Sequence, residues 1–229
     1  MKVNTMYWSE DSDDNKQVVV PENVVDVIYS ISCKCIPMDH AHALSEALQQ
    51  ALPWLQEEET AGIHQVYGAE SGNGWERPDT EVLYLSRRQK LTLRLPSARL
   101  EEATSLIGQT LDIAGYPLTV RDLATRKLSD LSTLFARHVL GEADQSEDEF
   151  MAQAVAQLNA MGIRVKKMMC GKEGRIELPD ATLHTRSLML ADLELEESVK
   201  LQEIGLGPGR KLGCGLFLPQ KGIKAVKPD

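Results

Sequence analysis

The chain has 229 residues, of which 42% are hydrophobic and 26% are charged, and its formal net charge at pH 7 is −9. This length allows one large domain or two small ones, and either can bury a core. The charge is unevenly spread: residues 1–150 carry 13 Lys and Arg against 25 Asp and Glu, whereas residues 151–229 carry 12 against 9. This composition excludes a general polyanion binder, so any contact with nucleic acid has to use a local basic surface.

Other classes are excluded by short-range patterns. No apolar run approaches the roughly 18–20 residues that a membrane span requires, and the acidic start MKVNTMYWSEDSDDNK is unlike a secretory signal. The four cysteines suit neither a disulfide framework nor a zinc site, so we expect reduced thiols and neither metal nor cofactor. They are Cys33, Cys35, Cys170 and Cys214. We expect a soluble cytoplasmic protein without a membrane partner.

The first half predicts the order β-α-β-β-α-β. The predicted elements are a strand at 24–36, a helix at 40–52, a pair of strands at 81–86 and 90–96, a helix at 98–108, and a strand at 110–120 that turns at Gly115. Asp39 is a good N-cap for the first helix, whose apolar residues recur at helical spacing. The Gly-rich stretch 62–79 predicts either a strand with a loop or an insertion.

The second half repeats this order. Its predicted elements are a strand at 132–140, a helix at 150–162, strands at 163–170 and 182–195, a helix at 195–205, and a strand at 213–219. Ser146 and Glu149 have the spacing of a capping box within the acidic loop 141–149. We therefore predict an α+β fold of two tandem ferredoxin-like (βαββαβ) units with a C-terminal Gly-rich loop. The predicted parts are an acidic tail at 1–22, a first unit at 23–126, and a second unit at 127–229.

The loop GLGPGRKLGCG (residues 205–215) is the sharpest local motif. Its five glycines allow the backbone to approach a phosphate closely, and Arg210 and Lys211 add positive charge. The loop leads from a helix into a strand and lacks the spacing of a nucleotide-binding loop. A purely structural Gly-rich turn is the alternative.

This loop resembles, glycine for glycine, the G-h-G-x5-G-h-G loop of the CRISPR repeat-processing endoribonucleases of the RAMP superfamily. The segments LMLADLELEESVKLQEIGLGPGRKLGCGLFLPQKGI, MDHAHAL, AGIHQVYGAESGNGW and LSRRQKLTLRLP look like the MYXAN subtype of that family. The resemblance covers the chain from about residue 23 onward. It implies a tandem ferredoxin-like fold that binds the stem-loop of a CRISPR repeat and cuts precursor RNA at the 3′ base of the stem.

The resemblance also implies a metal-independent reaction in which a ribose 2′-hydroxyl attacks the adjacent phosphate, leaving a 2′,3′-cyclic phosphate. It implies that the mature guide RNA stays bound and that the other partners are subunits of a type I interference complex, which in some relatives is transposon-associated. One alternative is a non-catalytic RNA-binding subunit of such a complex. Another is a phosphate-binding metabolic enzyme, which the absence of a cofactor motif opposes.

The reaction that the resemblance implies needs a base, an acid and cations, and histidine suits the first two roles. His40 stands at the start of the predicted helix, where the helix dipole favours the neutral ring. Members of the family commonly place a catalytic histidine in this region, so His40 is the first candidate and His42 the second. His64 is a candidate for the acid or for a residue that stacks on a base, and a structural role is the alternative for it. A capping or packing role for His40 is the alternative. His138 is predicted to be a core or hydrogen-bonded histidine.

For RNA contact, clusters of cations are expected to lie along the stem. A single charge run is more often a solvated face, but three clusters weigh against that. The predicted RNA-binding residues are Arg87, Arg88, Lys90, Lys166, Lys167, Arg175, Arg186, Gly207, Gly209, Arg210, Lys211 and Gly213.

Overall fold

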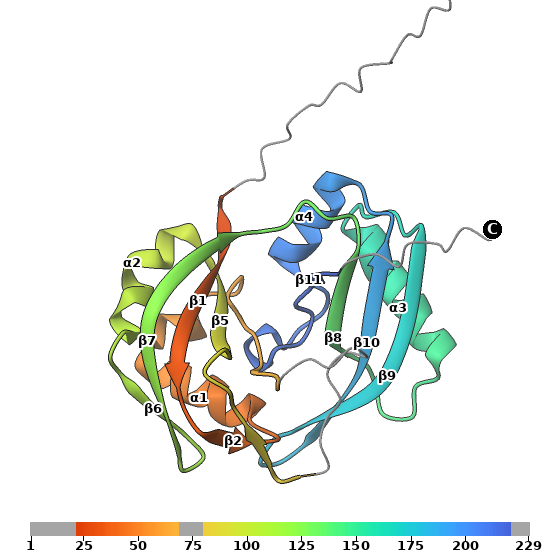
Figure 1. Cartoon of the computed structure of the whole chain (residues 1–229). Coiled ribbons are helices and arrows are strands. Elements are labelled where there is room, and N and C mark those ends of the chain that lie inside the picture. Colours follow the sequence, from red (N-terminus) through yellow and green to blue (C-terminus); the bar gives the residue numbers. More distant parts are fainter. Residues whose placement is uncertain (1–21, 69–79, 221–229) are drawn as a thin grey trace, which may run out of the picture.

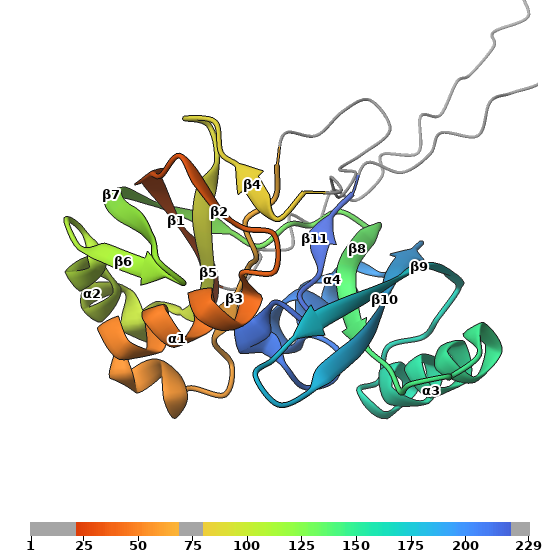
Figure 2. The same cartoon turned by 90° about the horizontal axis from the view of Figure 1, so that it is seen from below.

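The computed structural model describes residues 22–68 and 80–220, and it is a mixed α/β structure with antiparallel sheets (Figure 1). Most of the predicted acidic tail and part of the Gly-rich stretch 62–79 lie outside the described residues. Two main sheets face each other, and α2 and α3 lie on opposite outer sides of the molecule in both views (Figures 1 and 2). Within the described residues, no helix is long and apolar enough to cross a membrane.

The first sheet has five antiparallel strands. In spatial order they are β3 (Gly62–Ile63), β5 (Lys90–Pro96), β1 (Val24–Ser32), β7 (Tyr116–Lys127) and β6 (Thr110–Ile113). The helix α1 (Ala41–Ala51) buries the face that contains Leu44 and Leu48. These leucines join Val27, Tyr29 and Leu93 in one core, so the apolar period of the helix decides which face packs.

Short helical turns complete this half. They are η1 (Pro53–Gln56), η2 (Ser97–Arg99), α2 (Leu100–Ala103) and η3 (Thr104–Leu106). The helix predicted at 98–108 is therefore broken into three short pieces.

The second sheet has four antiparallel strands. In spatial order they are β11 (Leu218–Pro219), β8 (Leu134–Leu140), β10 (Thr182–Ala191) and β9 (Lys167–Glu177). The helices α3 (Glu147–Ala160) and α4 (Leu195–Ile204) bury Phe150 and Leu201 against Leu188 and Phe217. In each main sheet the strand that comes first in the chain lies in the interior: β1 lies between β5 and β7, and β8 lies between β10 and β11.

Several predicted boundaries are wrong. The strand predicted at 24–36 is divided, because β1 ends at Ser32 and β2 (Cys35–Pro37) pairs with β4 (Val82–Tyr84) in a separate two-stranded sheet. The strand pair predicted at 81–86 and 90–96 does not form. Both edges of β5 are occupied by β1 and β3, which leaves no edge for β4.

Other boundaries shift for local reasons. The strand predicted at 110–120 is a hairpin that turns at Ala114 and Gly115, both with positive φ, and β7 runs on to Lys127. The N-cap of α1 is His40 rather than Asp39, and the His40 side chain makes no cap hydrogen bond. The predicted capping box of Ser146 and Glu149 is confirmed. The last strand is only Leu218–Pro219, because the loop before it folds back on itself.

Candidate active site between the two halves

A cavity of about 780 Å³ opens between the halves. The first half lines it with the residues that precede and begin α1 and with Gln65, Val66 and Tyr67, and the second half lines it with side chains of β8, β9 and β10. The side chains of the cavity that can transfer a proton or stabilise the charge of a phosphate are His40, Tyr67, Arg137, His138, Lys172 and Arg175. Three acids, Asp39, Glu173 and Glu177, also lie on its wall.

His40 is held by main-chain groups on both sides of its ring. Its Nδ1 lies 3.0 Å from the carbonyl oxygen of Pro37, and the amide N–H of Val66 donates to its Nε2 at 3.1 Å. Because Nε2 accepts a hydrogen bond from the Val66 amide, the proton of the ring belongs on Nδ1, and the ring is neutral in this arrangement. The ring thereby joins the start of α1 to the segment that carries Tyr67.

Tyr67 and Arg137 stack across the boundary between the halves. The guanidinium carbon of Arg137 lies 4.5 Å from the centre of the Tyr67 ring, at the distance of a cation–π contact. Burial raises the pKa of Tyr67 well above its ordinary range, so its hydroxyl keeps its proton at neutral pH. The sequence offers no way to rank Tyr67 as a functional residue.

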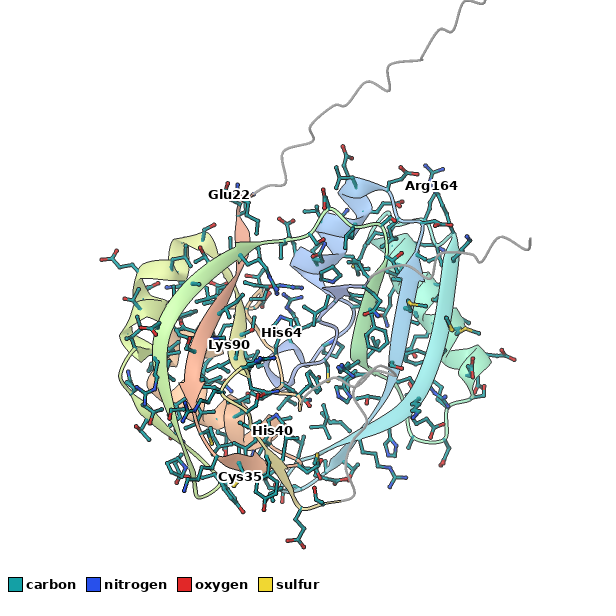
Figure 3. All side chains as sticks on the ribbon, in the orientation of Figure 1. Glu22, Cys35, His40, His64, Lys90 and Arg164 are labelled. Atoms are coloured by element: carbon teal, nitrogen blue, oxygen red, sulfur yellow. The ribbon has the colours of Figure 1, made fainter. Side chains whose placement is uncertain are left out.

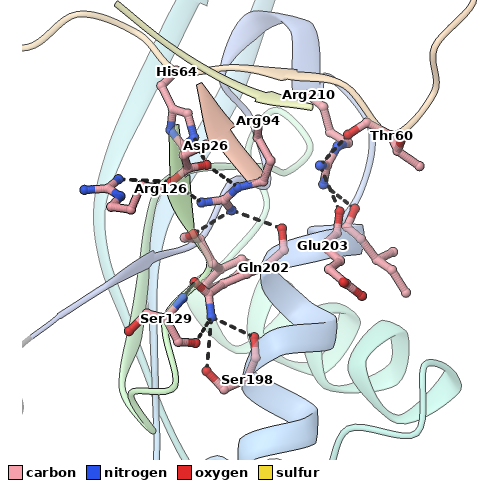
Figure 4. Close-up of polar contacts among 12 residues, drawn as sticks. Asp26, Thr60, His64, Arg94, Arg126, Ser129, Ser198, Gln202, Glu203 and Arg210 are labelled. Atoms are coloured by element: carbon pink, nitrogen blue, oxygen red, sulfur yellow. Dashed lines mark hydrogen bonds and ion pairs between the residues drawn. The ribbon is translucent and has the colours of Figure 1, made fainter. Parts of the chain in front are cut away.

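His64, the predicted partner of His40, lies in a different environment (Figures 3 and 4). It is buried with its Nε2 3.8 Å from Oδ1 of Asp26. The Asp26 carboxylate accepts two hydrogen bonds from Arg94, from Nε to Oδ1 at 2.8 Å and from Nη2 to Oδ2 at 3.2 Å. Burial lowers the pKa of His64; Asp26 opposes this, but the nearby charges of Arg94 and Arg126 act with burial, and the pKa stays below its ordinary value. Burial alone would raise the pKa of Asp26, but His64 and Arg94 outweigh this and hold it far below its usual range.

This cluster joins the halves. Nη1 of Arg94 donates to the carbonyl oxygens of Gln202 and Phe217 at 3.0 and 2.8 Å. The side-chain amide of Gln202 donates to the carbonyl oxygen of Ser129 at 2.7 Å (Figure 4). All these contacts are to the protein's own main chain or side chains. The geometry therefore gives the Asp26–Arg94 cluster a structural role.

His42 lines another hollow, beside Gly209 and Lys211, and its Nε2 lies 3.4 Å from Oε2 of Glu46 on the next turn of α1. The structure thus places the three predicted catalytic histidines in three separate environments. His138 is brought into the cavity that His40 lines, where its Nδ1 lies 3.0 Å from Oγ1 of Thr185. The predicted hydrogen-bonded role of His138 is confirmed, but no pattern in the sequence predicts its place in this cavity.

The Gly-rich loop connects the two halves. The Arg210 guanidinium is buried and donates to the carbonyl oxygens of Ile204, Glu203 and Thr60, and burial together with the charge of Arg94 lowers its pKa to about 10. These bonds go to the protein's own main chain, and Arg210 also lines the hollow beside Gly209 and Lys211, so its contact with RNA stays a prediction. Lys211 donates to the carbonyl oxygen of Gln56 at 2.7 Å.

The glycines of the loop are explained in part by its own packing. A Cβ on Gly215 would lie 2.2 Å from the carbonyl oxygen of Leu206, and one on Gly213 would lie 2.9 Å from Cγ of Gln65. Gly207 is exposed, so it is the glycine of the predicted set that the structure leaves most open to a ligand.

The other predicted cations lie on the surface. Arg87 and Arg88 are exposed before β5, and Lys90 donates to Ser30 Oγ at 2.9 Å. Lys166 and Lys167 form ion pairs with Glu194 and Asp192. Arg175 lines the cavity, whereas Arg186 contacts Glu173 and the carbonyl oxygen of Gln145, which belongs to the acidic loop 141–149. In the part of the chain that the structure describes, no group of three or more His, Cys, Asp or Glu side chains is arranged to hold a metal ion.

Comparisons with known proteins define the class. The model of the family described as Cas6 Crispr matches residues 25–222, so the chain belongs to the Cas6 CRISPR family. The "CRISPR-associated endonuclease Cas6" of Myxococcus xanthus (strain DK1622) is 31% identical over 195 residues, which are 85% of this chain and 81% of that protein.

Solved structures share the fold at low sequence identity. A "CRISPR associated protein Cas6" superposes with a TM-score of 0.60 at 9% identity, covering 86% of this chain and all of the other. "An RAMP protein binding different RNA substrates" has a TM-score of 0.56 at 14% identity, covering 84% and 98%. A Cas6-related protein from Pyrococcus furiosus has a TM-score of 0.52 at 13% identity, covering 89% and 100%.

Proposed function

We propose that this chain is an endoribonuclease that binds the stem-loop of a CRISPR repeat and cleaves precursor RNA at the 3′ base of the stem, in the cavity between the two halves. The observation that carries the proposal is that one cavity collects His40 and Tyr67 from the first half with Arg137, His138 and Lys172 from the second. Family membership and the endonuclease name of the Myxococcus relative support the same activity.

The proposed reaction uses the ribose 2′-hydroxyl as the nucleophile and needs no metal ion. His40 takes the proton of the 2′-hydroxyl, and the neutral ring that its contacts favour is the form that a base requires. The hydroxyl has to displace the Val66 amide from Nε2 as it binds. Arg137 and Lys172 stabilise the negative charge that develops on the phosphate, and the products are a 2′,3′-cyclic phosphate and a 5′-hydroxyl.

We also propose that the two main sheets are ferredoxin-like units, at residues 23–126 and 127–229. The strand orders β3-β5-β1-β7 and β11-β8-β10-β9 support this proposal. In a βαββαβ unit the first strand lies between the third and the fourth, as β1 does between β5 and β7 and β8 does between β10 and β11. The remaining strand of the first sheet, β6, adds to its edge beyond β7. We propose further that the guide RNA stays bound to the chain within a type I interference complex.

The test is cleavage of the neighbouring CRISPR repeat transcript in the presence of EDTA, followed by mapping of both product ends. We expect one cut and a cyclic phosphate, and we expect His40→Ala to lower the single-turnover rate at least ~10²-fold, the low end for general acid–base catalysis. The matched control is His42→Ala, two residues away on another surface, which should leave the rate unchanged. Full activity of His40→Ala would contradict the catalytic assignment.

A non-catalytic RNA-binding subunit is the second candidate, and the bonding of both His40 ring nitrogens to main-chain groups favours it. His40→Gln separates the two candidates. Its carboxamide oxygen retains an acceptor for the Val66 amide but takes no proton. We expect His40→Gln to be as slow as His40→Ala while binding the repeat normally, whereas absence of cleavage by the wild type under all tested conditions would support the binding subunit.

A further inference from the structure

The pairing register of the second sheet is irregular at Ser187 of β10. On β8, Ala136 pairs with Leu188 and Val139 pairs with Arg186, so the residues Arg137 and His138 face the single residue Ser187 of β10. On β9, Cys170 pairs with Leu188 and Glu173 with Arg186, so Gly171 and Lys172 also face Ser187. Both neighbours of β10 therefore carry a β-bulge at Ser187.

The bulge on β8 changes where His138 lies. Without it, strict alternation would place Ala136 and His138 on one face of the sheet. Instead Ala136 and Val139 are both in the core of the second half, and Arg137 and His138 both line the cavity. The extra residue thus moves a histidine from the expected core face to the cavity, beside Arg137.

Neighbouring residues fix the position of the His138 ring. Nδ1 lies 3.0 Å from Oγ1 of the buried Thr185, and a Cβ at Gly174 would lie 2.8 Å from that oxygen and 3.3 Å from Nδ1. The absence of a side chain at Gly174 therefore makes room for the pair. The main chain is also anchored, since the amide of Gly215 donates to the carbonyl oxygen of His138 at 2.7 Å.

We infer that His138 is a second catalytic residue, which protonates the departing 5′-oxygen; this inference rests on the function proposed above. As the 2′-oxygen forms its bond to phosphorus, the bond from phosphorus to the 5′-oxygen breaks, and His138 gives a proton to that oxygen while His40 holds the proton from the 2′-hydroxyl. Proton exchange with water then restores both rings. Thr185 holds the ring through Nδ1, so His138 acts as the imidazolium: it gives up the proton on Nε2 and is left as a neutral imidazole with its remaining proton on Nδ1.

The test compares two repeat RNAs in single-turnover cleavage, one natural and one with sulfur in place of the scissile 5′-oxygen. A thiolate leaves without protonation, so the sulfur substrate no longer needs the acid. We expect His138→Ala to lose at least ~10²-fold on the natural RNA and to cleave the sulfur RNA at the wild-type rate. His40→Ala should be slow on both.

Two further variants keep the result decisive. His138→Asn retains a group that can contact Thr185 but transfers no proton, so it should behave as His138→Ala does even if the alanine variant folds poorly. His184→Ala on β10 is the matched control and should cleave both RNAs normally. Equal losses on both RNAs by His138→Asn, or no loss on either, would overturn the inference, whereas wild-type protein that cuts neither RNA would overturn the proposed function itself.

Discussion

Two regions between the halves of this protein combine histidine with arginine, and their surroundings differ. Around Asp26, the three guanidinium nitrogens of the fully buried Arg94 donate to oxygens of the protein itself. His40, Arg137 and His138 line one cavity of about 780 Å³, which a substrate can enter. We propose that the same residue types have a structural role in the first region and a catalytic role in the second, because Asp26 and Arg94 are buried and hydrogen-bonded to the protein itself, whereas the His40 cavity is open.

The largest effect that tests this contrast concerns Asp26. Asp26→Ala leaves the buried charge of Arg94 without its carboxylate, so the free energy of unfolding should fall by about 3–5 kcal/mol in urea denaturation. Arg126→Ala removes a half-exposed partner of the same carboxylate and should cost about 0–1 kcal/mol. Equal losses for the two variants would show that burial of the pair does not matter.

Arg210 and Lys211 provide the next test, since they are neighbours with different surroundings. Arg210→Ala removes a buried guanidinium that bonds three carbonyl oxygens, and it should lower the free energy of unfolding by about 2–3 kcal/mol. Lys211→Ala should leave stability nearly unchanged and reduce the slope of repeat affinity against salt by about 1. A stable Arg210→Ala protein with a flattened salt dependence would instead make Arg210 a phosphate ligand.

The smallest effect is the pH dependence contributed by His64, which faces Asp26, Arg94 and Arg126. Its pKa is lowered in the folded protein, whereas the unfolded chain titrates near 6.5, so as the pH falls through about 6.5 the unfolded chain takes up the proton before the folded protein does. Stability should therefore fall as the pH is lowered, by at most about 1.4 kcal/mol per pH unit from this group. His64→Gln should flatten thermal-melting temperature against pH between 7 and 5, and an unchanged profile would remove His64 as the cause. Asp26 stays ionised over this range.

Much of the fold follows from local pattern. Helical spacing of apolar residues predicts α1, and Ser146 with Glu149 predicts the start of α3, because a helix end depends on groups within one turn. Strand pairing was less predictable. The segment 81–86 has the composition of a partner for β5, but β1 and β3 occupy both edges of β5, and nothing local indicates that.

The candidate site was predicted in part. His40 lines the cavity, but His42, two residues further along, lines another hollow beside α1. His64 lies after β3 and points to Asp26, a partner that no local pattern indicates. The consecutive polar residues Arg137 and His138 inside an apolar strand were the available signal for the bulge. That signal is weak, because the extra residue is recognisable only against the register of the neighbouring strand.

The sequence by itself determined the α+β class, the positions of the long helices and the family resemblance, because these depend on the order and spacing of residues along the chain. Only the tertiary structure decided which histidines share a cavity and which arginines are enclosed. Those properties arise where segments more than a hundred residues apart meet, as Arg94 meets Gln202 and Arg210 meets Thr60. Packing at such contacts excludes water from one polar cluster and leaves the other open, and no periodicity along the chain records that difference.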